Sequence, residues 1–380
     1  MLRNGDIKNE AHALGFTISG IALPAQPRTY PQYDSWLQAG RQAGMAYLAA
    51  ERARQRRADA RLILPEVRSL ISLGIRYPHP SSAPQPVHPG DHTGRIAAYA
   101  WGDDYHHVIP PRLAALHQRI ERIAGHAIAW RGYTDTGPIL ERDLAQQAGL
   151  GWIGKNTCLI NPQQGSYFLL AEMLLDLELE PDEPLRTDHC GSCTRCIDAC
   201  PTACILPDRT IDAGRCISYL TIENKGSIPR ELRPQMGDWV FGCDICQIVC
   251  PWNVRFAPSE SEPAFLPLPG IPQPNLVEEL QLSSHDFHRK FVNSPVQRAK
   301  RRGYLRNVAV ALGNTADAQT LPVLQQSMER EIEPLVRAHV AWAIGRINTR
   351  RARNILARAL KKEAELAVRA EIEGALERAP

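Results

Sequence analysis

The chain has 380 residues, of which 44% are hydrophobic and 22% charged, and its formal net charge is only +3. This is the composition of a globular protein with enough length for two or three domains. The N-terminus lacks the apolar stretch of a signal peptide, and charges interrupt every apolar run well before the roughly 18 residues that a membrane helix needs. These features exclude a membrane-spanning protein and predict a cytoplasmic one.

The first 180 residues alternate helix-like and strand-like patterns. Helices are predicted at 7–14, 111–123 and 139–148, and strands or other apolar elements at 69–77, 127–130 and 167–177. The proline-rich stretch 77–89 interrupts them and predicts an exposed loop. This alternation is typical of an α/β or α+β domain.

Two further proline-rich stretches, 181–184 and 258–274, are typical of linkers and divide the rest of the chain. Nine of the ten cysteines follow residue 189, and the sequence after the second linker is rich in arginine and alanine with helical periodicity. We therefore predict three domains: an α/β (α+β) catalytic domain at 1–180, a cysteine-rich module at 181–260 and an all-α tail at 275–380.

The tail contains a weak internal repeat. The segment Val308–Gly313 recurs as Val340–Gly345 and, more loosely, as Ile372–Leu376, at a spacing of 32 residues. Such a period predicts stacked helical pairs of the HEAT type, although chance similarity between alanine-rich helices gives the same pattern.

The tail is also basic. Residues 295–380 contain 16 Lys and Arg against 9 Asp and Glu, a net charge of +7, which leaves 28 minus 32, or −4, for the rest of the chain. Arg306 and Arg337 precede the first two copies of the repeat and are candidate phosphate contacts. This charge predicts a surface for a polyanion, and the alternative is a set of solvated helical faces.

The cysteine spacing indicates iron–sulfur clusters rather than disulfides, which a reducing compartment disfavours. The run from Cys190 to Cys200 reads C-x2-C-x2-C-x3-C-P, the pattern with which bacterial ferredoxins bind 4Fe-4S clusters. A second run from Cys243 to Cys250 reads C-x2-C-x3-C-P and is one cysteine short, and Cys216 can supply the missing ligand. In ferredoxins the last cysteine of a run crosses to the other cluster.

The predicted ligands are therefore Cys190, Cys193, Cys196 and Cys250 for one cluster, and Cys200, Cys216, Cys243 and Cys246 for the other. Zinc is the alternative, since C-x2-C pairs also bind that ion, but three-residue gaps before Cys-Pro favour cubanes. Cys158 and Cys204 are left over. Cys204 could replace Cys216 as a ligand, and otherwise both are interpreted as small buried apolar residues.

Four blocks of sequence resemble the epoxyqueuosine reductase family and occur in that family's order. They read TDTGPILER (134–142), GLGWIGKN (149–156), CISYLTIE (216–223) and GCDICQIVCPWN (242–253). The resemblance covers nearly the whole chain. It implies an oxidoreductase that uses cobalamin, reduced through two 4Fe-4S clusters, to convert the epoxide of epoxyqueuosine at the tRNA wobble position to the alkene of queuosine.

The resemblance also implies functional residues. Asp135 matches the family's proposed proton donor, a role that needs a pKa raised by burial, although a turn or helix-capping role also fits its position. The positions that match possible corrin or RNA contacts are Arg57, Tyr99, Lys155, Ser166 and Ser218. The motif Asp-x-His-x-x-Gly, with which some proteins ligate cobalamin, is absent because Ile109 occupies its glycine position. We therefore expect cobalamin without a histidine ligand from the protein.

The expected partners are the anticodon arm of tRNA and an external electron donor such as a flavodoxin or ferredoxin, and the chain is expected to act as a monomer. Two alternatives remain, a non-catalytic iron–sulfur electron-transfer protein and a flavin-dependent reductase of a small molecule. The 180 residues before the clusters argue against the first alternative, and the basic tail argues against the second.

Overall fold

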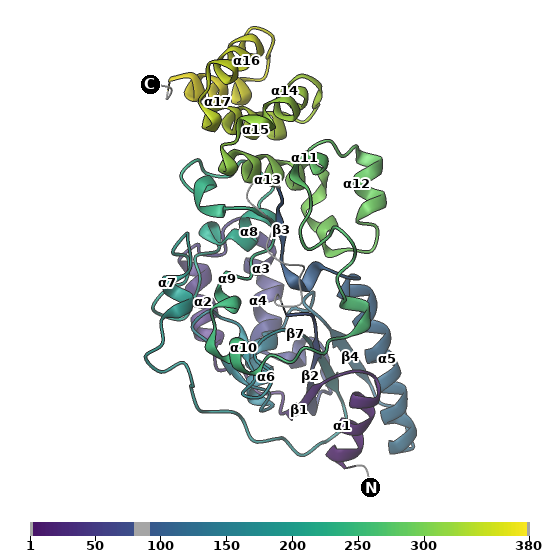
Figure 1. Ribbon diagram of the computed structural model, residues 1–380. Helices are drawn as coiled ribbons and strands as arrows, with labels where there is room; N and C mark the ends of the chain where they lie inside the picture. Colours follow the sequence, from purple (N-terminus) through teal and green to yellow (C-terminus); the bar gives the residue numbers. More distant parts are fainter. Residues whose placement is uncertain (1–2, 80–91, 378–380) are drawn as a thin grey trace. The chain divides into compact units, whose positions relative to one another are not determined.

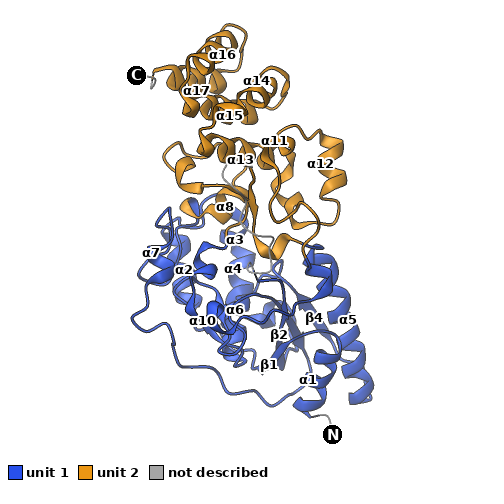
Figure 2. Ribbon diagram, viewed as in Figure 1, with its two compact units in different colours: residues 1–82, 102–214, 244–266 blue, residues 83–101, 215–243, 267–380 orange. Residues whose placement is uncertain are grey.

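The computed structural model describes residues 3–79 and 92–377. The chain divides into two compact units, each assembled from several segments (Figure 2). Unit 1 comprises residues 1–82, 102–214 and 244–266, and unit 2 comprises residues 83–101, 215–243 and 267–380. The division into three domains remains a prediction about functional modules, since compact units and functional modules need not coincide.

Unit 1 is built on a four-stranded antiparallel sheet in the order β1-β2-β7-β4. Its strands are β1 (Ile18–Ala22), β2 (Ser69–Arg76), β7 (Phe168–Leu175) and β4 (Trp130–Tyr133). The central strands β2 and β7 are mostly buried and rich in apolar residues, as expected for strands that are covered on both faces.

Helices cover this sheet on both sides (Figure 1). The helices α1 (Asn4–Ala13) and α5 (Tyr105–Ala124) pack together on one side, and α6 (Glu141–Gln147) packs against β1, β2 and β7. Leu70 of β2 and Leu174 of β7 are paired in register and share one apolar cluster with Leu144 of α6. Their burial holds α6 against the sheet and thereby positions the loop that connects β4 to α6.

The remaining elements of unit 1 are short. They are α2 (Tyr30–Gln38), α3 (Ala46–Ala49), α4 (Glu51–Ala58), β5 (Trp152–Ile153), β6 (Leu159–Ile160), α7 (Arg195–Asp198), α9 (Ile245–Ile248) and α10 (Pro251–Phe256). The helices α7 and α9, which each contain a cysteine of one of the two runs, pack against each other. A proline in the first turn of α10 costs no hydrogen bond, because N–H groups in the first turn have no partner within the helix.

Unit 2 combines a small parallel sheet with helices. The sheet pairs β3 (Arg95–Ile96) with β8 (Trp239–Phe241), and the first helices are α8 (Ile217–Ile222), α11 (Leu276–Glu279) and α12 (Ser284–Lys290). The helix α8 packs against β8, and the longer helix α13 (Lys300–Thr315) packs against both of them.

Five helices complete unit 2: α13 (Lys300–Thr315), α14 (Leu321–Arg330), α15 (Pro334–Ile347), α16 (Arg350–Leu360) and α17 (Leu366–Glu377). The helices α13, α15 and α17 pack in succession and carry the three copies of the repeat. A Cβ atom added at Gly313 would lie 2.5 Å from the ring of Trp342, and one added at Gly345 would lie 2.7 Å from Cβ of Ala375. The repeated glycines therefore let successive helices approach closely, and the predicted HEAT-like tail is confirmed.

Most predicted elements are present with shifted ends. The helix α5 begins at Tyr105 rather than at residue 111, because Asp104 caps it by accepting the N–H of His106. The strand β1 is missing from the predicted elements, and most of the loop predicted at 77–89 lies outside the described residues. Within residues 3–79 and 92–377, no helix combines the length and the apolar character that crossing a bilayer requires.

Candidate active site and cluster-binding segments

The loop between β4 and α6 presents Asp135, the predicted proton donor, at the surface of unit 1. Its backbone is left-handed (φ 60°), a conformation that costs energy in most residues and less in aspartate. The Thr134 hydroxyl donates to the Leu170 carbonyl (2.7 Å), and the Asp135 N–H donates to Oε1 of Glu141 (2.6 Å). These bonds hold the turn, while 67% of the Asp135 side chain stays exposed.

The Asp135 carboxylate meets the beginning of α5. The Tyr105 O–H donates to its Oδ2 atom (2.9 Å), which also lies 3.7 Å from Nε2 of His106. Asp104 holds the other ring nitrogen of His106 at 2.7 Å. Asp104, and then Asp135, raise the pKa of His106 to about 9. His106 is therefore positively charged at neutral pH.

Two further carboxyl groups belong to this region. Burial, and then the charge of Asp135, raise the pKa of Glu141 to about 7. Glu172 is fully buried on β7, where it accepts a hydrogen bond from the Ser72 hydroxyl (2.6 Å), and burial raises its pKa well above the ordinary value. Both carboxyl groups can therefore hold protons at neutral pH.

The pKa of Asp135 differs from the expectation. Its pKa is lowered, first by His106 and also by Tyr105, whereas the sequence argument required a raised pKa. The helix-capping alternative is wrong, because the N-cap position of α6 is Leu140 and no side chain caps that helix. At rest, the proton beside Asp135 therefore resides on His106.

The four cysteines predicted to bind one cluster all belong to unit 1: Cys190, Cys193, Cys196 and Cys250. Cys250 is buried in an apolar cluster with Trp152, against which Cys190 also packs, and the Trp152 N–H donates to the Cys190 sulfur at 3.5 Å. Burial, and then the neighbouring Cys190 and Cys250, raise the pKa of Cys196 to about 11. At least three of the four thiols are therefore neighbours, as the predicted ligand set requires.

Lys155, one of the predicted corrin or RNA contacts, holds the loop that carries Cys190 and Cys193. Its ammonium group donates to the carbonyl oxygens of Gly191 (2.7 Å) and Cys193 (3.0 Å). Gly191 has a left-handed backbone (φ 49°), which glycine adopts without the usual cost. Lys155 therefore shapes the first C-x2-C turn, and its contact with a corrin or RNA remains a prediction.

The second predicted ligand set takes Cys200 and Cys246 from unit 1, and Cys216 and Cys243 from unit 2. Cys204, the alternative ligand, is buried with its sulfur 3.4 Å from that of Cys200, and this contact lowers the pKa of Cys200 to about 5. Cys204 therefore adjoins a predicted ligand, and Cys216 remains the predicted fourth one.

Tyr167 offers an independent observation at Cys246. Its ring is buried, and within the described part of the chain its hydroxyl has no hydrogen-bond partner. Burial, followed by nearby groups that include Asp244 and Cys246, raises the pKa of Tyr167. A phenol O–H without an acceptor beside a predicted ligand fits a cluster, whose sulfur atoms accept hydrogen bonds.

The other predicted cofactor contacts are distributed over both units, with Arg57 and Ser166 in unit 1 and Tyr99 and Ser218 in unit 2. Arg57 is buried and lies over an aromatic ring. Ser166 is buried as well, and its hydroxyl donates to Gln247 (2.8 Å), between two cysteines of the second run. Tyr99 and Ser218 are half-buried residues of unit 2. Their roles as cofactor contacts remain predictions.

The two arginines predicted to contact phosphates are engaged within unit 2. Arg306 is fully buried, so the prediction that it contacts RNA is wrong. Arg337 donates two hydrogen bonds to Glu363 (2.8 and 2.9 Å), and only 16% of its side chain is exposed. The positions of the two arginines in the repeat give no indication that both side chains form hydrogen bonds within the protein.

Exposed basic residues lie instead on α16 and in the turn that follows it. They are Arg350, Arg351, Arg358, Lys361 and Lys362, and none forms an ion pair with another described residue. Because their charges are exposed, they can bind a polyanion without first breaking an ion pair.

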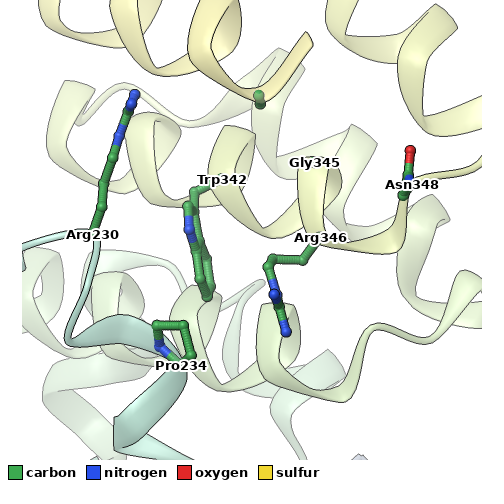
Figure 3. A pocket seen from close by; sticks show the side chains of 7 residues that line it. Arg230, Pro234, Trp342, Gly345, Arg346 and Asn348 are labelled. Atoms are coloured by element: carbon green, nitrogen blue, oxygen red, sulfur yellow. The ribbon is translucent and has the colours of Figure 1, made fainter. Parts of the chain in front are cut away.

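A hollow of about 300 Å³ lies nearby in unit 2, lined in part by Arg230, Trp342 and Arg346 (Figure 3). Arg230 is paired with Glu371 (2.9 Å), whereas Arg346 is exposed and its guanidinium carbon lies 5.9 Å from the centre of the Trp342 ring. The Trp342 ring itself is buried, so what the hollow offers a ligand is the positive charge of Arg346.

Three family models match separate parts of the chain. A model described as epoxyqueuosine reductase QueG matches residues 57–136, a 4Fe-4S double cluster binding domain matches 189–253, and HEAT repeats match 299–377. The chain thus contains the predicted double-cluster domain.

Curated relatives match over most of their length. The epoxyqueuosine reductase of Pseudomonas aeruginosa is 42% identical over 342 residues, which covers 90% of this chain and 93% of that protein. The epoxyqueuosine reductase of Escherichia coli is 37% identical over 342 residues, which covers 90% of this chain and 88% of that protein.

Solved structures match over nearly the whole chain. An epoxyqueuosine reductase with an epoxyqueuosine-modified tRNA stem loop has a TM-score of 0.91 and 32% identity, and the match covers 98% of this chain and 97% of that one. The Bacillus subtilis enzyme, solved with its catalytic loop swung out of the active site, has a TM-score of 0.89 and 31% identity, with 98% of both chains covered.

Proposed function

Because the chain belongs to the epoxyqueuosine reductase family, we propose that it reduces the epoxide of epoxyqueuosine in tRNA to the alkene of queuosine. The observation that carries the proposal is the site at Asp135, where Tyr105, His106 and Glu141 converge in a chain that matches the family over nearly its full length. The reaction consumes two electrons and two protons and releases the epoxide oxygen as water. The protein must therefore provide an electron path and a proton donor.

The electron path consists of two 4Fe-4S clusters held by the eight predicted cysteines. Support comes from the match to a double-cluster domain and from the neighbouring thiols of Cys190, Cys196 and Cys250. An external one-electron donor such as a flavodoxin or ferredoxin reduces the clusters in the cytoplasm, and the chain acts as a monomer.

Cobalamin is the proposed second cofactor. Cubanes transfer single electrons, so a carrier that stores a two-electron reduced state has to stand between them and the substrate, and cobalt in cobalamin supplies that chemistry when bound. Lys155 and Ser166 already use their polar groups within the protein, so these residues alone do not identify a corrin site. The proton chemistry below depends only on side chains of this chain.

The proton donor is the pair formed by His106 and Asp135. The epoxide oxygen would otherwise leave as a poor alkoxide, so a positioned acid accelerates its departure. Asp135 is exposed and accessible to a substrate, while the adjacent His106 imidazolium holds the proton at neutral pH. Asp135 passes this proton to the oxygen, and Glu141 is a second proton source because its pKa is about 7.

The tRNA arm binds the exposed basic surface of α16. Each lysine or arginine that contacts a phosphate releases counterions, so the affinity should fall steeply with salt. The double variant Arg351→Gln/Arg358→Gln should bind the modified stem loop more weakly and with a smaller salt dependence. The variant lacks two phosphate contacts. When the salt concentration rises from 50 to 200 mM, the affinity of the wild type should therefore fall by about tenfold more than that of the variant.

The matched control for this binding experiment is Arg122→Gln/Arg131→Gln, which removes two exposed arginines from unit 1. It should leave the affinity and the salt dependence close to those of the wild type. Equal behaviour of the two double variants would mean that the arginines of α16 only solvate their helix.

The proposed activity is tested with protein purified without oxygen and incubated with cobalamin. Its absorbance should show clusters together with a corrin, and reduced protein should convert epoxyqueuosine to queuosine in a tRNA stem loop. Clusters alone with no conversion would indicate an electron-transfer protein, and a flavin spectrum would indicate a flavin-dependent reductase.

A further inference from the structure

A guanidinium group, that of Arg306, is fully buried in α13, and no carboxylate of the described residues forms an ion pair with it. Arg306 donates from Nη1 to the carbonyl oxygens of Asn224 (2.7 Å) and Gly226 (2.6 Å), and from Nη2 to that of Leu220 (2.6 Å). Its Nε and Nη2 atoms also donate to Oδ1 of Asn307 (3.1 and 2.8 Å). All five N–H groups of the side chain are therefore used.

The adjacent residue, Asn307, completes the network and is fully buried as well. Its amide nitrogen donates to the carbonyl oxygens of Thr221 (2.8 Å) and Val240 (2.9 Å). The side-chain amide of Asn307 accepts two hydrogen bonds from Arg306 and donates two to these carbonyl oxygens, so all of its hydrogen-bonding positions are used. Asn307 thus joins the end of α8 to the strand β8.

These partners belong to the two segments of unit 2 that carry predicted cluster ligands. Cys216 directly precedes α8 as its N-cap residue, and Cys243 follows β8 after Gly242. The Thr221 hydroxyl accepts the N–H of Gly242 (3.0 Å), which ties the same two segments together next to Cys243. The network therefore fixes the backbone on which both cysteines are mounted.

The charge of Arg306 needs a physical reason, because a buried cation without a counter-ion is costly. Burial, and then the neighbouring Arg302 and Arg233, lower its pKa to about 9, so the group is still charged at neutral pH. Its carbonyl partners offer only dipoles. A cubane with four thiolate ligands carries net negative charge, so a cluster on Cys216 and Cys243 would favour a cation in the supporting network.

A purely structural role within the repeat is the alternative, and Arg337 shows what such a role involves. Arg337 pairs with Glu363 and donates to the carbonyl oxygens of Glu331 and Ile332, all of which belong to the repeat helices or their connections. The carbonyl partners of Arg306 lie at residues 220–226, outside the repeat helices.

We propose that Arg306 and Asn307 are positioning residues for the second 4Fe-4S cluster, because they hold together the segments that carry Cys216 and Cys243. This inference rests on the ligand set proposed above. The first helix of the repeat region thereby supports the redox centre, in addition to beginning the stack of helices that follows.

The test uses the full-length protein purified without oxygen. Arg306→Met and Asn307→Leu should each reduce the iron content from about eight to about four atoms per chain, and the electron paramagnetic resonance spectrum of the reduced protein should change from two interacting clusters to one. Arg337→Met is the matched control and should keep about eight irons. Arg306→Lys keeps the positive charge but has fewer hydrogen-bond donors, so it should hold the second cluster less firmly. A chelator should therefore remove about four irons from this variant about tenfold faster than from the wild type. The other four irons should be removed at the wild-type rate.

The outcomes separate this inference from the proposed ligand set. If Cys216→Ala keeps both clusters, the ligand set is wrong. If Cys216→Ala loses one cluster but folded Arg306→Met and Asn307→Leu proteins keep both, with Arg306→Lys releasing iron at the wild-type rate, the positioning role is overturned. Should Arg306→Met fail to fold, the chelation rates of Arg306→Lys decide.

Discussion

The protonation of His106 should limit the reaction at alkaline pH. With a pKa of about 9, the protonated fraction of the imidazole falls from about 90% at pH 8 to about 10% at pH 10. The rate of a single turnover with pre-reduced protein should therefore fall about tenfold over this range, and about tenfold for each further pH unit. The measurement is the conversion of epoxyqueuosine in a stem loop after rapid mixing, with cluster absorbance recorded at each pH to exclude loss of iron.

Three variants assign the alkaline decline to one group. His106→Gln should be slower at neutral pH and should lose the decline near pH 9. His107→Gln changes the adjacent, exposed histidine and should keep the wild-type profile. Glu141→Gln removes a proton source with a pKa of about 7 but should keep the decline near pH 9. A rate that stays constant from pH 7 to 10 in the wild type, or a decline that persists in His106→Gln, would refute the assignment.

The raised pKa of His106 also makes the stability of the folded protein depend on pH. The pKa of His106 is higher in the folded protein, about 9, than its ordinary value of 6.5. The stabilisation that it provides is therefore complete below pH 6.5 and is lost as the pH rises through about 9. The thermal midpoint of His106→Gln should accordingly approach that of the wild type as the pH increases from 6 to 10.

Three further results are expected. Asp135→Asn, which tolerates the left-handed backbone and can still accept the Tyr105 hydrogen bond, should slow single turnover by about 100-fold while both clusters remain; a wild-type rate would exclude Asp135 as the donor. Gly313→Ala should destabilise the protein by about 1 to 3 kcal/mol, because the added Cβ would clash with the Trp342 ring and with backbone. Gly303→Ala in the same helix has room for the added Cβ and should stabilise the protein by about 1 kcal/mol. Urea unfolding followed by circular dichroism measures both changes. Cys216→Ala should lose about four irons and Cys204→Ala none, and the reverse would make Cys204 the ligand.

The sequence predicts best those features that depend on neighbouring residues. The cysteine runs are local patterns, and the apolar run at 69–77 corresponds closely to β2 because a buried central strand needs continuous apolar side chains. The sequence pattern places the beginning of α5 too late, because Pro110 and Pro111 are typical of the start of a helix. In the folded protein both prolines lie in the interior of α5, where the packing of the helix tolerates them. The five-residue strand β1 carries too short a pattern to be recognised.

The site depends on contacts that are distant in sequence, so its chemistry was only partly predictable. Asp135 was identified through the resemblance, but the direction of its pKa shift is set by His106, 29 positions earlier in the sequence. Glu141 lies in the same sequence block as Asp135, and a glutamate six positions after a candidate acid was the available signal. The burial of Arg306 could not be predicted, because its carbonyl partners are 80 to 86 residues away.

The interleaved course of the chain sets an order for maturation during synthesis. The four cysteines of the first ligand set all lie within residues 190–250, and they have left the ribosome while the tail is still being translated. The segments that carry Cys216 and Cys243 gain their buried arginine and asparagine only when residues 300–315 have been made. If Arg306 and Asn307 position the second cluster as proposed, the first cubane can be inserted on a nascent chain, whereas stable insertion of the second requires the last fifth of the protein.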